Sequence, residues 1–150
     1  MKRTVRNSFG KGGFTLIEVV AVLLILGIVA AVVAVRMSDT SAYDLASQVE
    51  VVKNHLRYAQ IRAMNTDTVW GINFTGPTTY YLFKGADTKV LLPGEDSTII
   101  NLAAKKSGLT ITSGAQTITF DAYGSPGSAT ITIATSGGTI TVTQNTGFIP

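Results

Sequence analysis

The chain has no cysteine and only one histidine, His55, among its 150 residues. The lack of cysteine excludes a disulfide, a cysteine nucleophile and a cysteine-based metal site, and one histidine cannot form a multi-histidine metal site. A serine triad would have to use His55, and the sequence contains no Gly-x-Ser-x-Gly turn. We therefore expect no enzyme activity, no catalytic residue, no metal and no cofactor, and we interpret His55 as a surface or domain-contact residue.

Basic side chains are also missing from the C-terminal part, since no Lys or Arg follows Lys106. The net charge of +3 comes mainly from the first 13 residues, which contain four basic side chains and no acidic one. Without residues 1–13 the chain would carry eight basic and nine acidic side chains. The positive charge therefore belongs to the N-terminal segment and does not indicate nucleic-acid binding.

A long apolar segment follows this basic leader. It runs from Phe14 to Val35, and its 22 residues contain a single acid, Glu18. As a helix it would be about 33 Å long, which matches the hydrocarbon core of a bilayer. We predict a single membrane-spanning helix, with the basic leader on the cytoplasmic side. A carboxylate such as that of Glu18 costs about 2.5–3.5 kcal/mol at mid-depth in lipid and less near the end of the span, and it usually has a partner.

The junction between leader and apolar segment is unusual. A secretory signal peptide has its small-residue cleavage site after the apolar run, but here Gly12 and Gly13 stand before it. The sequence GFTLIEVV at residues 13–20 resembles the class III leader of type IV pilins and type II secretion pseudopilins. The resemblance implies that a membrane prepilin peptidase cuts between Gly13 and Phe14 and methylates the new amine of Phe14. The alternative is a plain signal anchor, which gives no reason for Glu18.

The same resemblance implies a role for Glu18 in assembly. In pilin-like proteins this acid pairs with the N-terminal amine of a neighbouring subunit and sets the register of the filament. Phe14 and Glu18 are four residues apart, so they lie on the same face of a helix. The alternative is that Glu18 merely lies at the level of the lipid headgroups.

The segment that follows predicts an amphipathic helix at about residues 41–64. Apolar residues recur there at spacings of three and four. They are Leu45, Val49, Val52, Leu56, Ala59 and Ala63. The simplest arrangement is one helix from Phe14 to about Met64, although Thr40 and Ser41 would also fit the cap of a separate second helix after a break near Asp39.

From Asp67 onward the pattern favours β-structure, because short runs of Thr, Val, Ile and aromatic residues alternate with turn residues. The expected strands are Val69–Phe74, Thr79–Phe83, Thr88–Leu91, Thr98–Leu102, Leu109–Thr112, Thr117–Phe120, Ala129–Ala134 and Thr139–Thr143. The turn Ser136-Gly137-Gly138 predicts a hairpin with isoleucines and Val142 on one face and threonines on the other.

These elements define the expected domain organisation. We predict an α+β, pilin-like fold in which a long N-terminal α-helix packs on an antiparallel β-sheet. Residues 1–13 form a leader that is removed, residues 14–35 the membrane and filament-core helix, and residues 36–150 the periplasmic domain, with its sheet at about 67–145.

The soluble part resembles the GspH/FimT group of minor pseudopilins and minor pilins. The resemblance is carried by residues 56–64 with the strand 69–74, by residues 120–126 with 131–133, and by residues 140–142 with Gly147. It implies a structural subunit of a pilus-like filament. Its partners would be other pilin-like subunits, the prepilin peptidase and methyltransferase, and an inner-membrane assembly platform.

The function that we favour is a minor pseudopilin of type II secretion, acting in initiation or at the tip of the pseudopilus. The alternative is a minor pilin of a type IV pilus acting in assembly, adhesion or motility. A DNA-binding tip pilin is disfavoured, because residues 146–150 lack the basic residue that such proteins use and Lys105-Lys106 is the only basic pair left. We expect the protein in the bacterial inner membrane as a single-pass protein, and later in the filament.

Two further sets of residues have open interpretations. Asp87, Glu95 and Asp96 would suit either a calcium site or a solvated acidic turn, and their spacing favours the turn. Trp70, Tyr80 and Tyr81 would suit either an aromatic contact surface or the core of the sheet.

Overall fold

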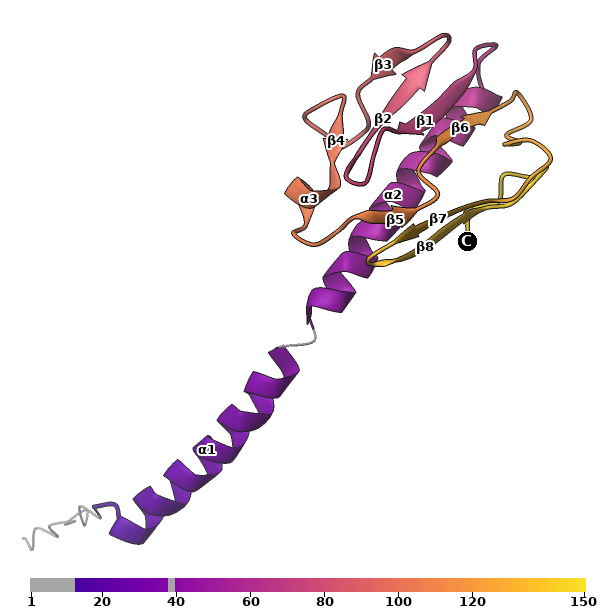
Figure 1. Cartoon of the computed structure of the whole chain (residues 1–150). Coiled ribbons are helices and arrows are strands. Elements are labelled where there is room, and N and C mark those ends of the chain that lie inside the picture. The colour runs from indigo at the N-terminus through magenta and orange to yellow at the C-terminus, as the bar shows by residue number, and fades with distance from the viewer. Residues whose placement is uncertain (1–12, 38–39) are drawn as a thin grey trace, which may run out of the picture. The chain divides into compact units, whose positions relative to one another are not determined.

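The computed structural model of the chain describes residues 13–37 and 40–150. The chain divides into two compact units, residues 1–39 and residues 40–150 (Figure 1). The first unit contains helix α1 (Leu16–Met37), and the second contains helix α2 (Thr40–Met64) with all of the strands. The choice between one continuous helix and a break near Asp39 depends on residues 38–39, which lie outside the described residues.

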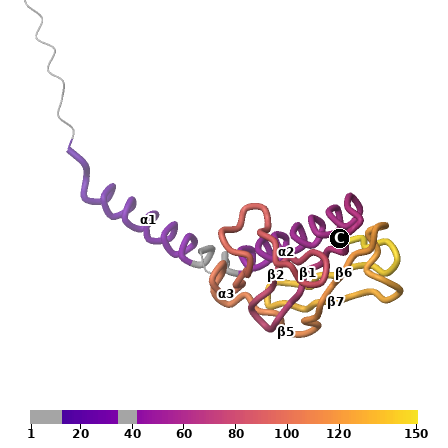
Figure 2. The backbone as a smooth tube through the Cα atoms, turned by 90° about the horizontal axis from the view of Figure 1, so that it is seen from above, coloured from indigo at the N-terminus to yellow at the C-terminus, as the bar shows by residue number. Residues whose placement is uncertain are grey.

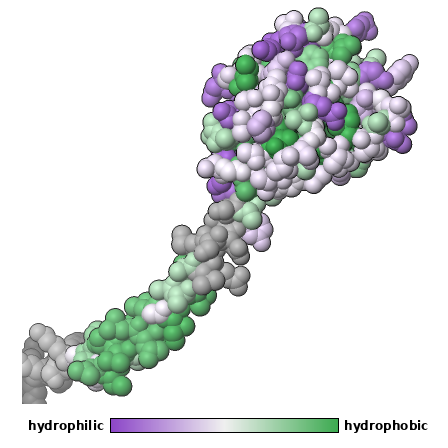
Figure 3. All heavy atoms as spheres, in the orientation of Figure 1, coloured by the Kyte–Doolittle hydropathy of each residue, from purple (hydrophilic) through white to green (hydrophobic). Residues whose placement is uncertain are grey.

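From Leu16 to Ala34, helix α1 is apolar on all sides apart from Glu18. The stretch Leu16–Ala34 has a mean hydropathy of 3.1, and none of it is buried within the structure. In Figure 3 the coloured part of this helix is almost entirely hydrophobic. Within the described residues it is the one helix long and apolar enough to cross a membrane. Its apolar surface must therefore be covered by lipid or by other proteins.

The second unit packs α2 against two antiparallel sheets (Figures 1 and 2). The larger sheet has the order β3-β2-β1-β6, with β4 also paired to β2, and the smaller sheet has the order β5-β7-β8. The strands are β1 (Trp70–Phe74), β2 (Thr79–Lys84), β3 (Thr88–Val90), β4 (Ile100–Asn101), β5 (Ile111–Ser113), β6 (Thr117–Phe120), β7 (Ile131–Thr135) and β8 (Gly138–Val142).

The core lies between α2 and both sheets. The apolar stripe of α2 is buried as predicted, and Leu45 at its beginning is partly buried. The core side chains of α2 are Val49, Val52, Leu56, Ala59 and Ala63, each at most 3% exposed. They share one cluster with Ile72 and Ile118 of the larger sheet and with Ile133 and Ile140 of the smaller one. The spacing of three and four thus places the apolar residues on one face of α2, and this face packs against both sheets.

The predicted hairpin is formed by β7 and β8. Five residue pairs join the strands, from Ile131 opposite Val142 to Thr135 opposite Gly138, so that Ser136 and Gly137 make the turn. Ile133 and Ile140 lie opposite each other and are buried, as predicted. The turn lies on α2, since a Cβ on Gly137 would be 2.7 Å from the carbonyl oxygen of Leu45.

The prediction was wrong in two places. The expected strand 98–102 is only two residues long, because a short helix α3 (Leu102–Lys105) begins there. The Asn101 side chain caps this helix by accepting hydrogen bonds from the amides of Ala103 (3.0 Å) and Ala104 (3.3 Å). The single expected sheet is divided in two, because β5 pairs with β7 and not with the larger sheet.

Candidate functional site

The first turn of α1 is organised by Thr15. Its hydroxyl oxygen accepts a hydrogen bond from the Glu18 amide at 3.3 Å, and its carbonyl accepts from the amides of Glu18 (3.1 Å) and Val19 (3.2 Å). Thr15 is therefore the N-cap of α1, and Thr15-Leu16-Ile17-Glu18 has the spacing of a capping box. Sequence reasoning assigned Glu18 either to assembly or to the level of the lipid headgroups. The structure places it also where a carboxylate stabilises the start of a helix, by about 0.3–1 kcal/mol.

Gly13 and Phe14 are open to the surroundings. Phe14 is 82% exposed, and a Cβ added to Gly13 would meet no atom within 4 Å. Nothing in the described part of the chain therefore requires a glycine at position 13. A requirement for glycine here would have to come from another molecule, such as a protease.

Phe14 and Glu18 lie on one side of α1, as their spacing predicts. Together with Val19, Val22 and Leu23 they line a shallow groove of about 230 Å³. Glu18 is the acidic side chain among these apolar ones. A partner that covered this groove would leave the carboxylate without water, so it would have to supply a cation or hydrogen-bond donors.

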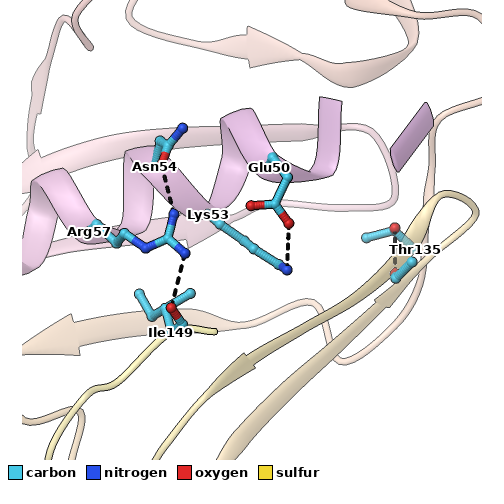
Figure 4. A network of polar contacts seen from close by, with 7 residues as sticks. Glu50, Lys53, Asn54, Arg57, Thr135 and Ile149 are labelled. Carbon is cyan, nitrogen blue, oxygen red and sulfur yellow. Dashed lines mark hydrogen bonds and ion pairs between the residues drawn. The ribbon is translucent and has the colours of Figure 1, made fainter. Parts of the chain in front are cut away.

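In the second unit (residues 40–150), which we call the globular unit, polar side chains of α2 hold the C-terminal tail that follows β8. The amide nitrogen of Gln60 donates to the carbonyls of Gly124 (2.8 Å), Gly147 (3.1 Å) and Thr146 (3.2 Å). Arg57 donates to the carbonyl of Ile149 at 3.0 Å and is itself held by Asn54, as Figure 4 shows. Arg57 and Gln60 lie outside the apolar stripe from which the helix was predicted. The contacts with the tail have no signal in the local pattern, because those partners lie more than 60 residues away in the chain.

His55 is buried between α2 and β2. It is 6% exposed, and its Nδ1 lies 2.8 Å from the hydroxyl oxygen of Tyr80. Burial lowers the pKa of His55 and Lys105 adds to this effect, while Glu95 and the backbone of Pro93 act in the opposite direction. Burial also raises the pKa of Tyr80. The domain-contact interpretation of His55 is therefore correct, and the surface interpretation is wrong.

The strand aromatics belong to the core. Trp70, Tyr80 and Tyr81 are 3%, 1% and 6% exposed. The guanidinium of Arg62 lies 4.8 Å from the centre of the Trp70 ring, and the Trp70 ring nitrogen donates to the hydroxyl of Thr66 at 2.7 Å. These residues therefore do not form an aromatic contact surface.

Two of the three acidic side chains of the region 87–96 have partners of their own. Asp87 accepts a hydrogen bond from the Tyr81 hydroxyl at 3.0 Å, and Glu95 pairs with Lys105 at 2.6 Å. Among the described residues no group of three or more Asp, Glu, His or Cys side chains is placed to hold a metal ion. This arrangement gives the calcium interpretation no support.

The basic pair Lys105-Lys106 is also occupied by carboxylates. Lys105 pairs with Glu95, and Lys106 pairs with Asp44 at 2.6 Å. Each lysine has its own counter-charge, so the pair does not present two free cations to a phosphate backbone. This observation weighs further against capture of DNA.

Comparison with known protein families gives two matches. Residues 9–34 match the prokaryotic N-terminal methylation motif, and residues 48–147 match the type II transport protein GspH. No curated protein and no solved structure matches the chain. The first match covers Gly13, Phe14 and Glu18, and the second covers most of α2 and all of the strands. Because the second match spans two thirds of the chain, the protein belongs to the GspH family of type II transport proteins, within the pilin-like subunits that carry an N-terminal methylation motif.

Proposed function

We propose that this protein is a minor pseudopilin of the type II secretion system that helps to initiate the pseudopilus or forms part of its tip. The match of residues 48–147 to GspH supports this assignment. The observation that carries it is helix α1, which has a methylation motif at its start and a fully exposed apolar surface. Such a surface suits first a bilayer and then a bundle of like helices.

Maturation of the protein follows from its N-terminal residues. A prepilin peptidase removes residues 1–13 and methylates the amine of Phe14. The segment 14–35 anchors the chain in the inner membrane, and the domain 36–150 lies in the periplasm. The basic leader supports this orientation, because Lys and Arg beside an apolar helix stay on the cytoplasmic side.

Glu18 then selects the neighbouring subunit. Its carboxylate lines an apolar groove on α1, so any subunit that covers this groove must compensate the charge. The amine of Phe14 in a neighbour supplies such a cation once the leader has been removed. Cleavage therefore precedes assembly, because an uncut chain has no amine at this position.

The first test addresses cleavage. We expect Gly13→Leu to retain the leader and to remain in the membrane, as measured by intact mass and by cell fractionation. Gly27→Leu is a matched control, because a Cβ at Gly27 also meets no atom within 4 Å. It should lose residues 1–13 normally. Normal processing of Gly13→Leu would contradict the peptidase assignment.

The second test addresses assembly. We expect Glu18→Leu to be inserted and cleaved normally but to be incorporated poorly into filaments, as measured in sheared pseudopilus fractions. Thr15→Val removes the capping hydroxyl and leaves the carboxylate, so it separates helix capping from pairing. It should assemble almost like the parent. Equal losses in both variants would mean that Glu18 acts only through the helix start.

The alternative function is a minor pilin of a type IV pilus, because the same fold serves both machines. Deletion of the gene separates the two. Exported proteins trapped in the periplasm support the secretion system, whereas loss of surface pili with normal secretion supports the pilus.

A further inference from the structure

Four large apolar side chains are exposed around the C-terminal end of α2. We call this set the end patch. It consists of Ile61 (54% exposed), Met64 (53%), Tyr123 (87%) and Phe148 (63%). Ile61 and Met64 belong to the last turns of α2, Tyr123 to the loop after β6, and Phe148 to the C-terminal tail. The chain reaches α2 at Thr40, so the patch lies at the opposite end of this helix.

The three segments that carry the patch touch one another. A Cβ on Gly124, next to Tyr123, would lie 2.8 Å from the sulfur of Met64. A Cβ on Gly147, next to Phe148, would collide with the carbonyl of Gly124 and with the side chain of Gln60. The hydrogen bonds of Gln60 join the same two loops to the helix. The three segments that carry the patch are therefore packed together.

The two loops are also held from within. The Asp121 carboxylate accepts hydrogen bonds from the amides of Tyr123 (2.9 Å) and Ser125 (2.8 Å). The Thr143 amide donates to the carbonyl of Phe148 at 2.9 Å, and the Asn145 amide donates to the carbonyl of Gly127 at 2.8 Å. A surface held in this way loses little conformational entropy when a partner binds.

The electrostatics of this end of the chain restrict the partner. The 44 residues from Ser107 to Pro150 contain one charged side chain, Asp121, and its carboxylate is already bonded to backbone amides. Two cations of α2 lie in the same turns as Ile61 and Met64, and both are engaged within the domain. Arg57 is bonded to Asn54 and to the carbonyl of Ile149, and Arg62 lies over the Trp70 ring, so neither is offered freely to a nucleic acid or an anionic lipid. Exposed Tyr, Phe and Met with few charges are typical of the core of a protein–protein interface. The partner surface should therefore be an uncharged protein surface.

The size of the patch indicates how that partner is held. Four side chains at these exposures present on the order of 500 Å². A stable interface between freely diffusing proteins buries about 800 Å² on each partner. The end patch alone is therefore too small to capture a diffusing protein firmly. It is large enough for a partner that is already held beside it, because tethering gives effective concentrations in the millimolar range.

Subunits that share a filament through their apolar helices satisfy this condition. We propose that the end patch docks on an uncharged surface of the globular domain of another pilin-like subunit in the same filament. This inference rests on the proposed function. The exposed helix α1 supplies the tether, and the end patch adds a second contact that fixes which globular domains lie side by side.

Site-specific photo-crosslinking in the full-length chain tests the proposal. The probe is p-benzoylphenylalanine, introduced at Tyr123 or Phe148 in cells that assemble the filament. The products are identified by mass spectrometry. We expect both positions to crosslink to a pilin-like subunit. Leu91, which is 50% exposed in the loop after β3, is the matched control and should give at least about fivefold less of this product.

A probe at Leu23 of α1 separates failure of this inference from failure of the proposed function. Crosslinks from Leu23 to a pilin-like subunit, with none from Tyr123 and Phe148, would overturn the end patch and leave the filament role intact. No such crosslink from any position would overturn both. Crosslinks from the end patch to exported proteins only would overturn the docking proposal.

Charge substitution gives an independent measurement. We expect Tyr123→Glu and Phe148→Glu to reduce incorporation into filaments by about tenfold, because a carboxylate at an apolar contact loses its water. Cleavage of the leader and thermal unfolding should stay as in the parent, since both side chains are exposed. Leu91→Glu should assemble normally. Parental incorporation of both end-patch variants would refute the proposal.

Discussion

Substitution of Gln60 tests most directly how the globular unit holds its C-terminal tail. The amide nitrogen of this side chain reaches three carbonyls, at 2.8, 3.1 and 3.2 Å, but carries only two hydrogens. Each hydrogen bond contributes about 0.5–1.5 kcal/mol net, so Gln60→Ala should lower the free energy of unfolding by about 1–3 kcal/mol. We expect this loss in a fragment that begins at Thr40, because the buried core cluster lies entirely after that residue.

Urea unfolding of this fragment measures the effect. With a denaturant slope on the order of 1–2 kcal/mol/M, a loss of about 2 kcal/mol lowers the midpoint by about 1–2 M. Gln48→Ala is the control for helix propensity, because Gln48 is also half-buried in α2 and its side chain forms no hydrogen bond with any described residue. It should change the stability by less than about 0.5 kcal/mol.

Gln60→Glu is a second variant that tests whether the side chain acts as a hydrogen-bond donor. It places a carboxylate, which has no hydrogen to donate, against the same carbonyl oxygens. It should therefore be less stable than Gln60→Ala at neutral pH and should recover part of the loss when the carboxyl is protonated. If Gln60→Ala and Gln48→Ala unfold at the same urea concentration, the hydrogen bonds of Gln60 contribute nothing to the free energy of unfolding, and the prediction is refuted.

Two further predictions concern the same unit. The pKa of His55 is lowered in the folded state, so the unfolded chain takes up a proton first as the pH falls below about 6.5, and stability should decrease there. Urea midpoints between pH 7.5 and 5.5 should show a smaller decrease for His55→Gln, and equal slopes would contradict the assignment. Gly147 has a φ of 63° and lies against Gly124, so Gly147→Ala should cost about 2–4 kcal/mol in calorimetry. Gly76→Ala should unfold within a few degrees of the parent, because a Cβ there meets no atom within 4 Å.

Features with a local pattern could be predicted from the sequence. Each of the eight predicted strands overlaps an observed one, because alternation and turn residues act over a few positions. The stripe of α2 and the inward face of the β7–β8 hairpin follow from periods of about 3.6 and 2 residues. The anchoring helix follows from its length and hydropathy.

Features that depend on distant residues could not be predicted. The hydrogen bonds of Gln60 are one example, because its partners lie 64 to 87 positions later in the chain. The sequence left His55 open between a surface and a domain-contact residue, because Tyr80 and the segment around Pro93 meet it only in the folded state. The division into two sheets depends on whether β5 pairs with β6 or β7, and both strands have the same alternation. The N-cap role of Thr15 did have a local signal, since Thr-x-x-Glu at a helix start is a capping box.

The apolar helix itself cannot decide which neighbour the subunit meets. Burial of apolar surface from water gives about 25 cal/mol per Å², but lipid tails are as apolar as a bundle of Leu and Val side chains. Transfer of α1 from bilayer to filament therefore gains little hydrophobic free energy. Between Phe14 and Val35 only Thr15 and Glu18 are polar, and Thr15 is used within its own helix. In the assembly that we propose, selection of a neighbour is therefore assigned to the Glu18 carboxylate and to the surface of the globular unit, while the remaining side chains of the helix keep the subunit in apolar surroundings.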